Sequence, residues 1–272
     1  MNQAATPFAD LLRTWRSERR ISQLELATEA DISQKHLSFI ETGRAAPSRD
    51  LVLLLAERLD VPLRERNTFL IAAGYAPLFR DRPLTDPALA PVLTSIERLL
   101  KAHEPYPAVG LDRHWNLVVA NASVAPLLAG VDPELLKPPV NVLRLSMHPR
   151  GLKPRIINFD EWADHLLHRA RRQLRITRDR ELGALLLEMT SYNADVPSFH
   201  RTQSLLPEEV VVPLKLRTQG AVLSLLSTVT AFGTAVDITV SELTLESFYP
   251  ADEETRALLQ ADVSGFTVGK AV

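Results

Sequence analysis

The chain has 272 residues, 46% of them hydrophobic, and a formal net charge of −2, which suffices for two domains that each bury a core. It contains no cysteine, so disulfides, thiolate zinc sites, thiol redox sensing, a cysteine nucleophile and a cysteinyl-flavin photosensor are excluded. We expect a cytoplasmic protein, because the N-terminus has no charged and then apolar leader and no apolar run reaches about 18 residues.

An amphipathic helix is expected near the N-terminus. Its apolar face holds Phe8, Leu11, Leu12 and Trp15, which are spaced for one side of a helix. The other side carries most of a set of arginines: Arg13, Arg16, Arg19 and Arg20.

Residues 22–44 predict two short helices joined by a tight turn. Ser22 and Glu25 form a capping box, so the first of these helices begins at Gln23. Asp31 closes it, and Ile32 is the apolar residue of the turn. The apolar side is predicted to hold Leu24, Leu26, Ala27 and Ala30, while Glu25, Thr28 and Glu29 face water.

Ser33 caps the second helix, which runs from Gln34 to about Glu41, buries Leu37 and Ile40, and ends at Thr42-Gly43. Its outward face holds Gln34, Lys35, Ser38 and Phe39. Two short helices joined by a tight turn are the layout of proteins that read the major groove of DNA. In that groove, Phe39 would contact thymine methyl groups and Gln34 would read an adenine edge. The alternatives are that Phe39 packs on a neighbouring helix, and that Lys35 contacts a phosphate instead of a base.

Two further helices complete a five-helix bundle. Ser48 caps the fourth helix, and Pro62 opens the fifth, which stops at Ala73-Gly74 before Pro77. Their apolar residues are Leu51, Leu54, Leu55 and Leu59 in the fourth helix and Phe69 and Leu70 in the fifth.

Residues from about 8 to 74 resemble the phage repressor and Cro type of helix-turn-helix domain, the XRE family. The resemblance rests on Ser22-Gln23, Ala27, Ile32-Ser33-Gln34, Ile40-Glu41-Thr42-Gly43 and Pro47-Ser48. It implies binding to double-stranded DNA. By this resemblance, Gln23 and the backbone from Thr42 to Arg44 hold phosphates, and Gln34, Lys35 and Phe39 approach base edges.

Charge is balanced in this region, since residues 1–76 contain ten basic and ten acidic side chains. DNA-binding domains are usually basic. We therefore expect modest non-specific affinity, with binding that depends on the local placement of Lys35, Arg44 and Arg49 and on two half-sites.

A linker is predicted between about Tyr75 and Ala90, where Pro77, Pro83 and Pro87 crowd together and Pro91 follows directly. An amphipathic helix follows from Leu89 through His103. It either packs on the second domain, which we favour, or forms a dimer seam.

Beyond this helix the periodicity indicates strands. Ala108 to Leu111 and Trp115 to Asn121 come first, and an antiparallel meander is predicted at Val210 to Leu216, Val222 to Phe232 and Val236 to Phe248. Its turns fall at Thr218-Gln219-Gly220 and Gly233-Thr234. In the last strand Leu243 and Leu245 alternate with Glu242, Thr244 and Glu246, which predicts one buried and one wet face.

Helices are expected from Asp160 to about Arg175 and from Asp179 to Tyr192, which makes the second domain an α+β sensor-like domain. Residues from about 105 to 255 resemble the PAS-like ligand-binding domain of MmyB-type transcription regulators. This resemblance rests on the segments LDRHWN from Leu111, Ala120-Asn121-Ala122, NVLRL from Asn141, His148-Pro149 and FDEW from Phe159. We divide the chain into a helix-turn-helix domain at 1–76, a linker and connecting helix at 77–104, a PAS-like domain at 105–255 and a C-terminal tail at 256–272.

The resemblance implies a small apolar or acyl ligand, fatty-acid-like in character, between sheet and helices. Candidate wall residues are Trp115, Leu117, Val119, Leu143, Trp162, Leu166, Leu214 and Phe248. Asn121, Arg144 and His148 are candidates for a ligand head group. In the alternative interpretation the apolar residues are ordinary core and the polar ones cap turns.

Other chemistry finds little support. His165 and His168 lie three apart on a predicted helix, but no further metal ligand is evident, so a solvated face is the better interpretation. The arginine-rich run from Arg169 to Arg180 contacts either DNA or an anionic ligand, or is a helix flank and loop. No nucleophile elbow, phosphate-binding glycine loop or dinucleotide fingerprint is present, so we expect neither catalysis nor a cofactor or metal.

The sequence therefore predicts a homodimeric, sequence-specific transcriptional regulator, by default a repressor, whose C-terminal domain senses a small molecule. The sensed molecule would shift the spacing or freedom of two recognition helices. Two alternatives stay open: an enzyme or carrier domain targeted by the N-terminal bundle, and a C-terminal domain that only forms a dimer.

Overall fold

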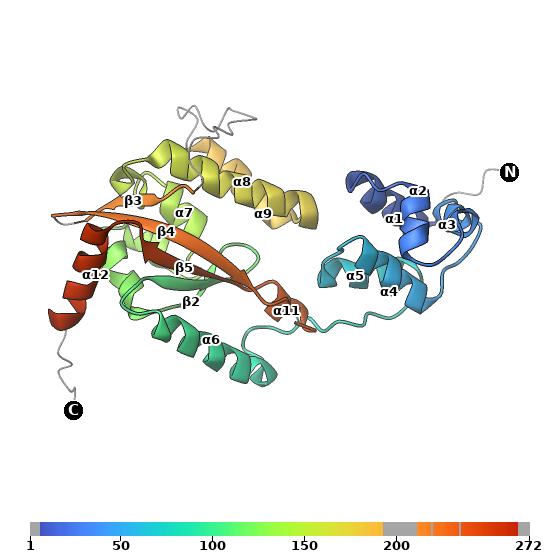
Figure 1. Ribbon diagram of the computed structural model, residues 1–272, viewed down its shortest axis with the longest axis horizontal. Coiled ribbons are helices and arrows are strands. Elements are labelled where there is room, and N and C mark those ends of the chain that lie inside the picture. The colour runs from blue at the N-terminus through green and yellow to red at the C-terminus, as the bar shows by residue number, and fades with distance from the viewer. Residues whose placement is uncertain (1–5, 193–210, 219, 234, 266–272) are drawn as a thin grey trace. The chain divides into compact units, whose positions relative to one another are not determined.

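The computed structural model describes residues 6–192, 211–218, 220–233 and 235–265 (Figure 1). Its contacts divide the chain into two compact units. The first contains residues 1–84 together with 233–241, and the second contains residues 85–232 and 242–272.

Five helices form the first unit. They are α1 (Pro7–Glu18), α2 (Gln23–Glu29), α3 (Gln34–Glu41), α4 (Arg49–Arg58) and α5 (Leu63–Ala72). The predicted caps are present: Ser22 and Glu25 form a capping box, and the Ser33 and Ser48 side chains accept a backbone N–H of the first turn. The five-helix architecture is thus confirmed.

The core of this bundle is built around aromatic residues of α1 and α5. Phe69 meets Phe8 and Trp15 edge to face, with ring centroids 5.7 and 6.1 Å apart. Leu26, Ala27 and Ala30 are buried as predicted, but Leu24 is 59% exposed. Leu24 precedes Leu26 by two residues, a rotation of about 200° around the helix, so it lies on the opposite side.

The second unit contains a five-stranded antiparallel sheet in the order β2-β1-β5-β4-β3. The strands are β1 (Ala108–Leu111), β2 (Leu117–Ala120), β3 (Leu214–Arg217), β4 (Val222–Ala231) and β5 (Thr244–Pro250). With its helices, this sheet confirms the predicted α+β class.

Helices of the second unit cover the sheet (Figure 1). They are α6 (Ala90–Ala102), α7 (Val142–Met147), α8 (Phe159–Thr177), α9 (Arg180–Ser191) and α12 (Glu253–Gly265). α6 buries Ile96 and Leu100 and contacts β1 and β2, which is the packing favoured for this helix. α12 crosses residue 255, where we place the end of the PAS-like domain.

The predicted last strand is wrong in its first half. Val236 to Ser241 leave the sheet and contain a short helix, α11 (Ile238–Ser241), so β5 begins only at Thr244. Residues 233–241 group with the first unit by their contacts. Of the other predicted meander residues, Val210, Gln219 and Thr234 lie outside the described residues.

The expected wet face of the last strand is also wrong at one position. Leu243 and Leu245 are buried as predicted, but Glu246 is only 2% exposed. β5 is the central strand of the sheet, and Arg169 of α8 pairs with Glu246 at 2.9 Å. A buried carboxylate requires such a partner.

Candidate nucleic-acid interface and ligand cavity

The outward face of α3 is polar and carries one ring. Gln34 and Lys35 are exposed, and Ser38 and Phe39 are half-buried. Lys35 Nζ lies 5.7 Å from the centroid of the Phe39 ring, and Arg44 Cζ lies 6.0 Å from it. Among the described residues, Phe39 is not one of the apolar side chains that pack against the bundle core. Two cations therefore flank a ring at the surface.

The turn after α3 is fixed by the Phe39 carbonyl. The backbone N–H groups of Arg44 and Ala45 donate to this oxygen at 2.8 and 3.1 Å, and the Thr42 hydroxyl donates to the Ser38 carbonyl at 2.8 Å. Gly43 takes a left-handed φ of 72°, which glycine adopts without steric cost. The Thr42 to Arg44 backbone is thereby held in one conformation.

Gln23 takes part in a buried network that sequence reasoning missed. Its Nε2 donates to Glu41 Oε2 at 2.7 Å, and Arg16 donates to both oxygens of Glu41, at 2.6 and 2.9 Å. Glu41 is only 2% exposed, and its hydrogen bond raises the pKa of Arg16 above the ordinary value. The Gln23 amide nitrogen carries two hydrogens, so one remains for a phosphate.

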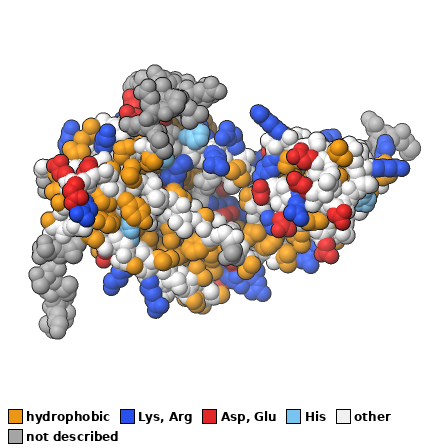
Figure 2. All heavy atoms as spheres, viewed as in Figure 1, with side chains coloured by type: hydrophobic (Ala, Val, Ile, Leu, Met, Phe, Trp, Pro, Cys, Tyr) orange, Lys and Arg blue, Asp and Glu red, His pale blue; other side chains and the backbone are white. Residues whose placement is uncertain are grey.

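Basic and acidic side chains intermingle on the face of the first unit shown in Figure 2. Lys35, Arg44 and Arg49 are exposed, and within the described part of the chain none of them forms an ion pair. The charge of this unit is therefore balanced, with three free cations near α3 and the start of α4.

A cavity of about 300 Å³ lies in the second unit, between α8, the β1–β2 turn and strands β4 and β5. Its lining residues are Leu111, Asp112, Arg113, Trp115, Arg169, Arg172, Gln173, Ile176, Thr177, Val229, Glu242 and Thr244. Of the candidate ligand residues from the sequence, Trp115 lines this cavity.

Trp115 is held in place as a wall of the cavity. It has a left-handed φ of 66°, which is a strained conformation for a large residue. The Asp112 carboxylate accepts hydrogen bonds from the N–H groups of His114 and Asn116, both at 2.8 Å, and this fixes the turn. The indole Nε1 donates to Gln173 Oε1 at 2.9 Å. Arg169 Cζ lies 4.7 Å from the ring centroid.

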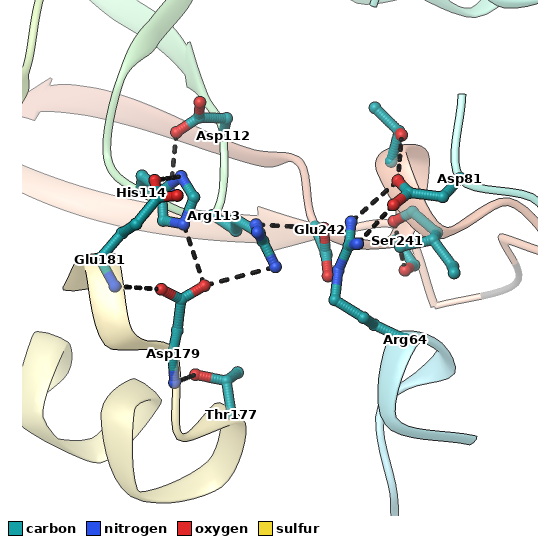
Figure 3. Close-up of polar contacts among 12 residues, drawn as sticks. Arg64, Asp81, Asp112, Arg113, His114, Thr177, Asp179, Glu181, Ser241 and Glu242 are labelled. Carbon is teal, nitrogen blue, oxygen red and sulfur yellow. Dashed lines mark hydrogen bonds and ion pairs between the residues drawn. The ribbon is translucent and has the colours of Figure 1, made fainter. Parts of the chain in front are cut away.

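Charged groups gather at one side of the cavity (Figure 3). Arg113 lies between Asp179, at 3.3 Å, and Glu242, at 3.9 Å. His114 Nε2 is 2.9 Å from Asp179. Burial alone raises the pKa of Asp179, but hydrogen bonds from the Leu182 N–H and from His114, together with Arg113, hold it below the ordinary value.

Arg172 differs from the other cavity arginines. Arg169 is paired with Glu246, and Arg113 is shared between two carboxylates. Arg172 is exposed, and among the described residues it forms no ion pair. The cavity thus combines an apolar wall with an available cation. Sequence reasoning noted the arginine run but did not connect it with Trp115.

Most of the other candidate wall residues lie in or against the core of the second unit. Leu143, Trp162, Leu166 and Leu214 are buried there, and Leu117 and Phe248 pack against it. Val119 is half-buried. Trp162 Nε1 has no hydrogen-bond partner within the described residues. No lining residue of the 300 Å³ cavity comes from this set.

The three candidate head-group residues each have partners inside the protein. The Asn121 amide donates to the carbonyls of Leu100 and Tyr106 and accepts from the Ala108 N–H. Arg144 donates to both oxygens of Glu188 at 2.7 Å. His148 Nδ1 accepts from the Arg150 N–H at 3.0 Å.

The histidine pair on α8 is divided between two environments. His168 is exposed, but His165 stacks on Trp162 with ring centroids 5.3 Å apart. Within the described ranges no cluster of side chains suits a metal ion. No helix among these residues has the length and apolarity needed to cross a membrane.

Two family models match the chain. A helix-turn-helix family model matches residues 12–66, so the first unit is a DNA-binding domain of that class and the XRE-type resemblance is confirmed. The model of the MmyB-like transcription regulator ligand binding domain matches residues 92–261, more than half of the chain. The chain belongs to this family of transcription regulators.

Other comparisons add little. No curated protein matches the chain. The crystal structure of the clp gene regulator ClgR from Corynebacterium glutamicum is 22% identical with a TM-score of 0.23, and the match covers 39% of this chain and 99% of that one. An RNA-binding Light-Oxygen-Voltage receptor is 12% identical with a TM-score of 0.28, over 93% of this chain and 62% of that one. At such TM-scores neither structure carries an argument.

Proposed function

We propose that this regulator is a cytoplasmic homodimeric repressor whose affinity for DNA is controlled by a small apolar or acyl ligand in the cavity of the second unit. The observation that carries this proposal is that one cavity is lined both by the apolar Trp115 and by Arg172, which has no ion pair among the described residues. A fatty-acid-like ligand has matching parts, an apolar body and an anionic end.

The ligand's apolar body would lie against Leu111, Trp115, Ile176 and Val229. Its anionic end would bind Arg172, because a guanidinium without a carboxylate partner gives a charge-assisted bond with no competing ion pair to break. Arg113 is already shared between two carboxylates, so it would respond to the ligand rather than supply its main contact.

The α3 face would read DNA. Gln34 and Phe39 are exposed enough to contact an adenine edge and a thymine methyl group, and Ser38 lies between them on the helix. Lys35, Arg44 and Arg49 are free to contact phosphates, together with Gln23 and the Thr42 to Arg44 turn.

The balanced charge of the first unit favours a dimer in this proposal. A single unit with balanced charge has little non-specific attraction to DNA, so two half-sites are needed for useful affinity. The dimer would repress transcription by occupying a promoter until the ligand changes the dimer's affinity for DNA.

Native mass spectrometry of the purified protein tests the proposal, followed by extraction of bound molecules and DNA binding with and without the extract. The duplex is one that the protein itself selects from a random-sequence library. A retained amphiphile that changes DNA affinity supports the proposal.

The matched variants for this experiment are Ile176→Trp, which places a larger ring in the cavity, and Leu187→Trp, which adds the same ring at a 75% exposed position on α9. Only the first should reduce retention. An empty wild-type protein with unchanged DNA binding favours a C-terminal domain that only dimerises, whereas chemical conversion of the extract by the full chain favours an enzyme.

A further inference from the structure

The segment between β4 and β5 is bonded to the linker that follows the helix-turn-helix bundle. The Asp237 carboxylate, 7% exposed, pairs with the Arg82 guanidinium at 2.5 Å. The Ile238 N–H donates to the Arg80 carbonyl at 2.8 Å, and the Thr239 hydroxyl donates to the Arg82 carbonyl. Three successive residues of a loop between strands therefore hold the linker.

The same linker is bonded to α5. The Asn67 amide donates to the Phe79 carbonyl at 2.8 Å and accepts the N–H groups of Leu78 and Phe79 at 2.9 and 3.0 Å. Arg64 is turned toward Asp81 and pairs with both oxygens of its carboxylate (Figure 3). We call the side chains that make these bonds the clasp: Arg64, Asn67, Asp81, Arg82, Asp237 and Thr239.

The segment that carries Asp237 and Thr239 of the clasp continues directly into the cavity wall. Ser241 is the last residue of α11, and the next residue, Glu242, lines the cavity and lies 3.9 Å from Arg113. Thr244 of β5 and Val229 of β4 also line the cavity. The chain thus passes from Thr239 of the clasp to Glu242 of the cavity wall within three residues.

We infer that the clasp transmits occupancy of the cavity to the DNA-binding unit. A ligand or an added side chain that occupies the cavity displaces Arg113 or Glu242, which both line it, and thereby shifts the residues between α11 and β5. The Asp237–Arg82 bond then loosens, and α5, whose Phe69 and Leu70 are in the bundle core, loses its tie to the loop. A ligand shifts such an equilibrium only by its different affinity for the clasped and unclasped states.

This inference rests on the proposed ligand function, so its test uses neither an unknown ligand nor an operator. Hydrogen exchange is measured on the full chain with the cavity filled by Ile176→Trp or by Val229→Trp, which enter it from α8 and from β4. We expect a several-fold faster exchange at residues 78–82 and in α5. Leu187→Trp, outside the cavity, should leave both segments unchanged.

The decisive comparison adds Asp237→Asn to the filled protein. Asparagine keeps the oxygen that accepts the Thr239 N–H at 3.0 Å but removes the charge that pairs with Arg82. Exchange at residues 78–82 should then be fast whether or not the cavity is filled. Thr239→Val deletes the hydroxyl that donates to the Arg82 carbonyl, and it should open the clasp in the same way.

Two results would overturn the inference. One is faster exchange around the cavity in both filled variants with no change at residues 78–82. The other is an undiminished response to filling in both clasp variants, which would make the clasp a structural staple only. Because no ligand is added, failure to extract one bears on the proposed function and leaves this test intact.

Discussion

Glu41 shows how a single residue can support both the fold and the recognition helix. It ends α3, is almost completely buried, and accepts hydrogen bonds from Arg16 of α1 and Gln23 of α2. Removing one partner of a buried ion pair leaves an uncompensated charge, which costs more than the pair itself contributes.

Arg16→Met should therefore lower the free energy of unfolding by about 3 kcal/mol, because among the described residues it leaves the buried Glu41 carboxylate with Gln23 alone as a side-chain partner. Urea unfolding of the full chain measures this change. Arg13→Met is the matched control: its pair with Asp10 is exposed, so a loss of less than about 1 kcal/mol is expected. Equal losses in the two variants would contradict the argument.

Phe39 and Arg49 should affect DNA binding in different ways. Phe39→Ala removes a ring held between two cations, so base preference should relax while the dependence of affinity on salt stays the same. Arg49→Gln should weaken binding to all sequences and reduce the slope of log K against log salt by about 1.

Fluorescence anisotropy over a salt series, with selected and scrambled duplexes, separates these two effects. Arg98→Gln changes an exposed arginine on α6 and serves as the control for loss of charge. A reduced salt slope in Phe39→Ala with unaltered base preference would exclude a base-reading role for the ring.

At the scale of elements, His165 in α8 should make the stability of the folded protein depend on pH. Burial, followed by the charge of Arg169, lowers the pKa of His165 below the ordinary histidine value of 6.5, while Glu246 opposes this and His168 adds to it. The folded state thus binds a proton less readily than the unfolded state. Stability is complete above about pH 6.5 and falls as the pH drops from there toward the folded-state pKa.

His165→Gln should flatten this fall between about pH 7 and pH 5 in thermal unfolding curves. His36→Gln, at an exposed position of α3, is the matched histidine replacement. If the His165 variant keeps the wild-type slope over this range, carboxylates rather than His165 account for the acid sensitivity.

The elements that could be predicted are those whose signals lie within a few residues. The capping box of Ser22 and Glu25 and the cap at Ser33 predict α2 and α3 at the observed residues, because they satisfy local backbone donors. α11 was missed because Val236, Ile238 and Val240 favour a strand, whereas bonds to Arg80 and Arg82 hold the segment out of the sheet.

The cavity could not be predicted from the sequence for a related reason. Its lining comes from the β1–β2 turn, α8, β4 and β5, which are far apart in the sequence. Periodicity identifies which face of an element is apolar, but it does not show where two apolar faces leave a cavity between them. Most of the apolar residues proposed as ligand walls therefore lie in the core. The ion pair of Arg16 could not be predicted from the sequence, because its partner Glu41 is 25 residues away.

For the whole molecule, control by a ligand implies a reciprocal effect of DNA on the ligand. If occupancy of the cavity changes affinity for the selected duplex by some factor, the duplex must change affinity for the ligand by the same factor. Decanoate is a suitable probe, since it has an apolar chain and one carboxylate for Arg172. Isothermal titration with decanoate, with and without saturating duplex, measures one factor, and duplex binding with and without decanoate measures the other.

We expect the two factors to agree and both to move toward one in Ile176→Trp, whose larger ring takes up part of the cavity. In Asp237→Asn decanoate should still bind, because Asp237 does not line the cavity, but its effect on duplex affinity should diminish. Decanoate binding that the duplex leaves unchanged in the wild-type protein would mean that the cavity and the recognition helix are uncoupled. Loss of coupling in Asp237→Asn with retained binding would instead locate the connection in the segment that contains Asp237 and joins the end of β4 to the start of β5.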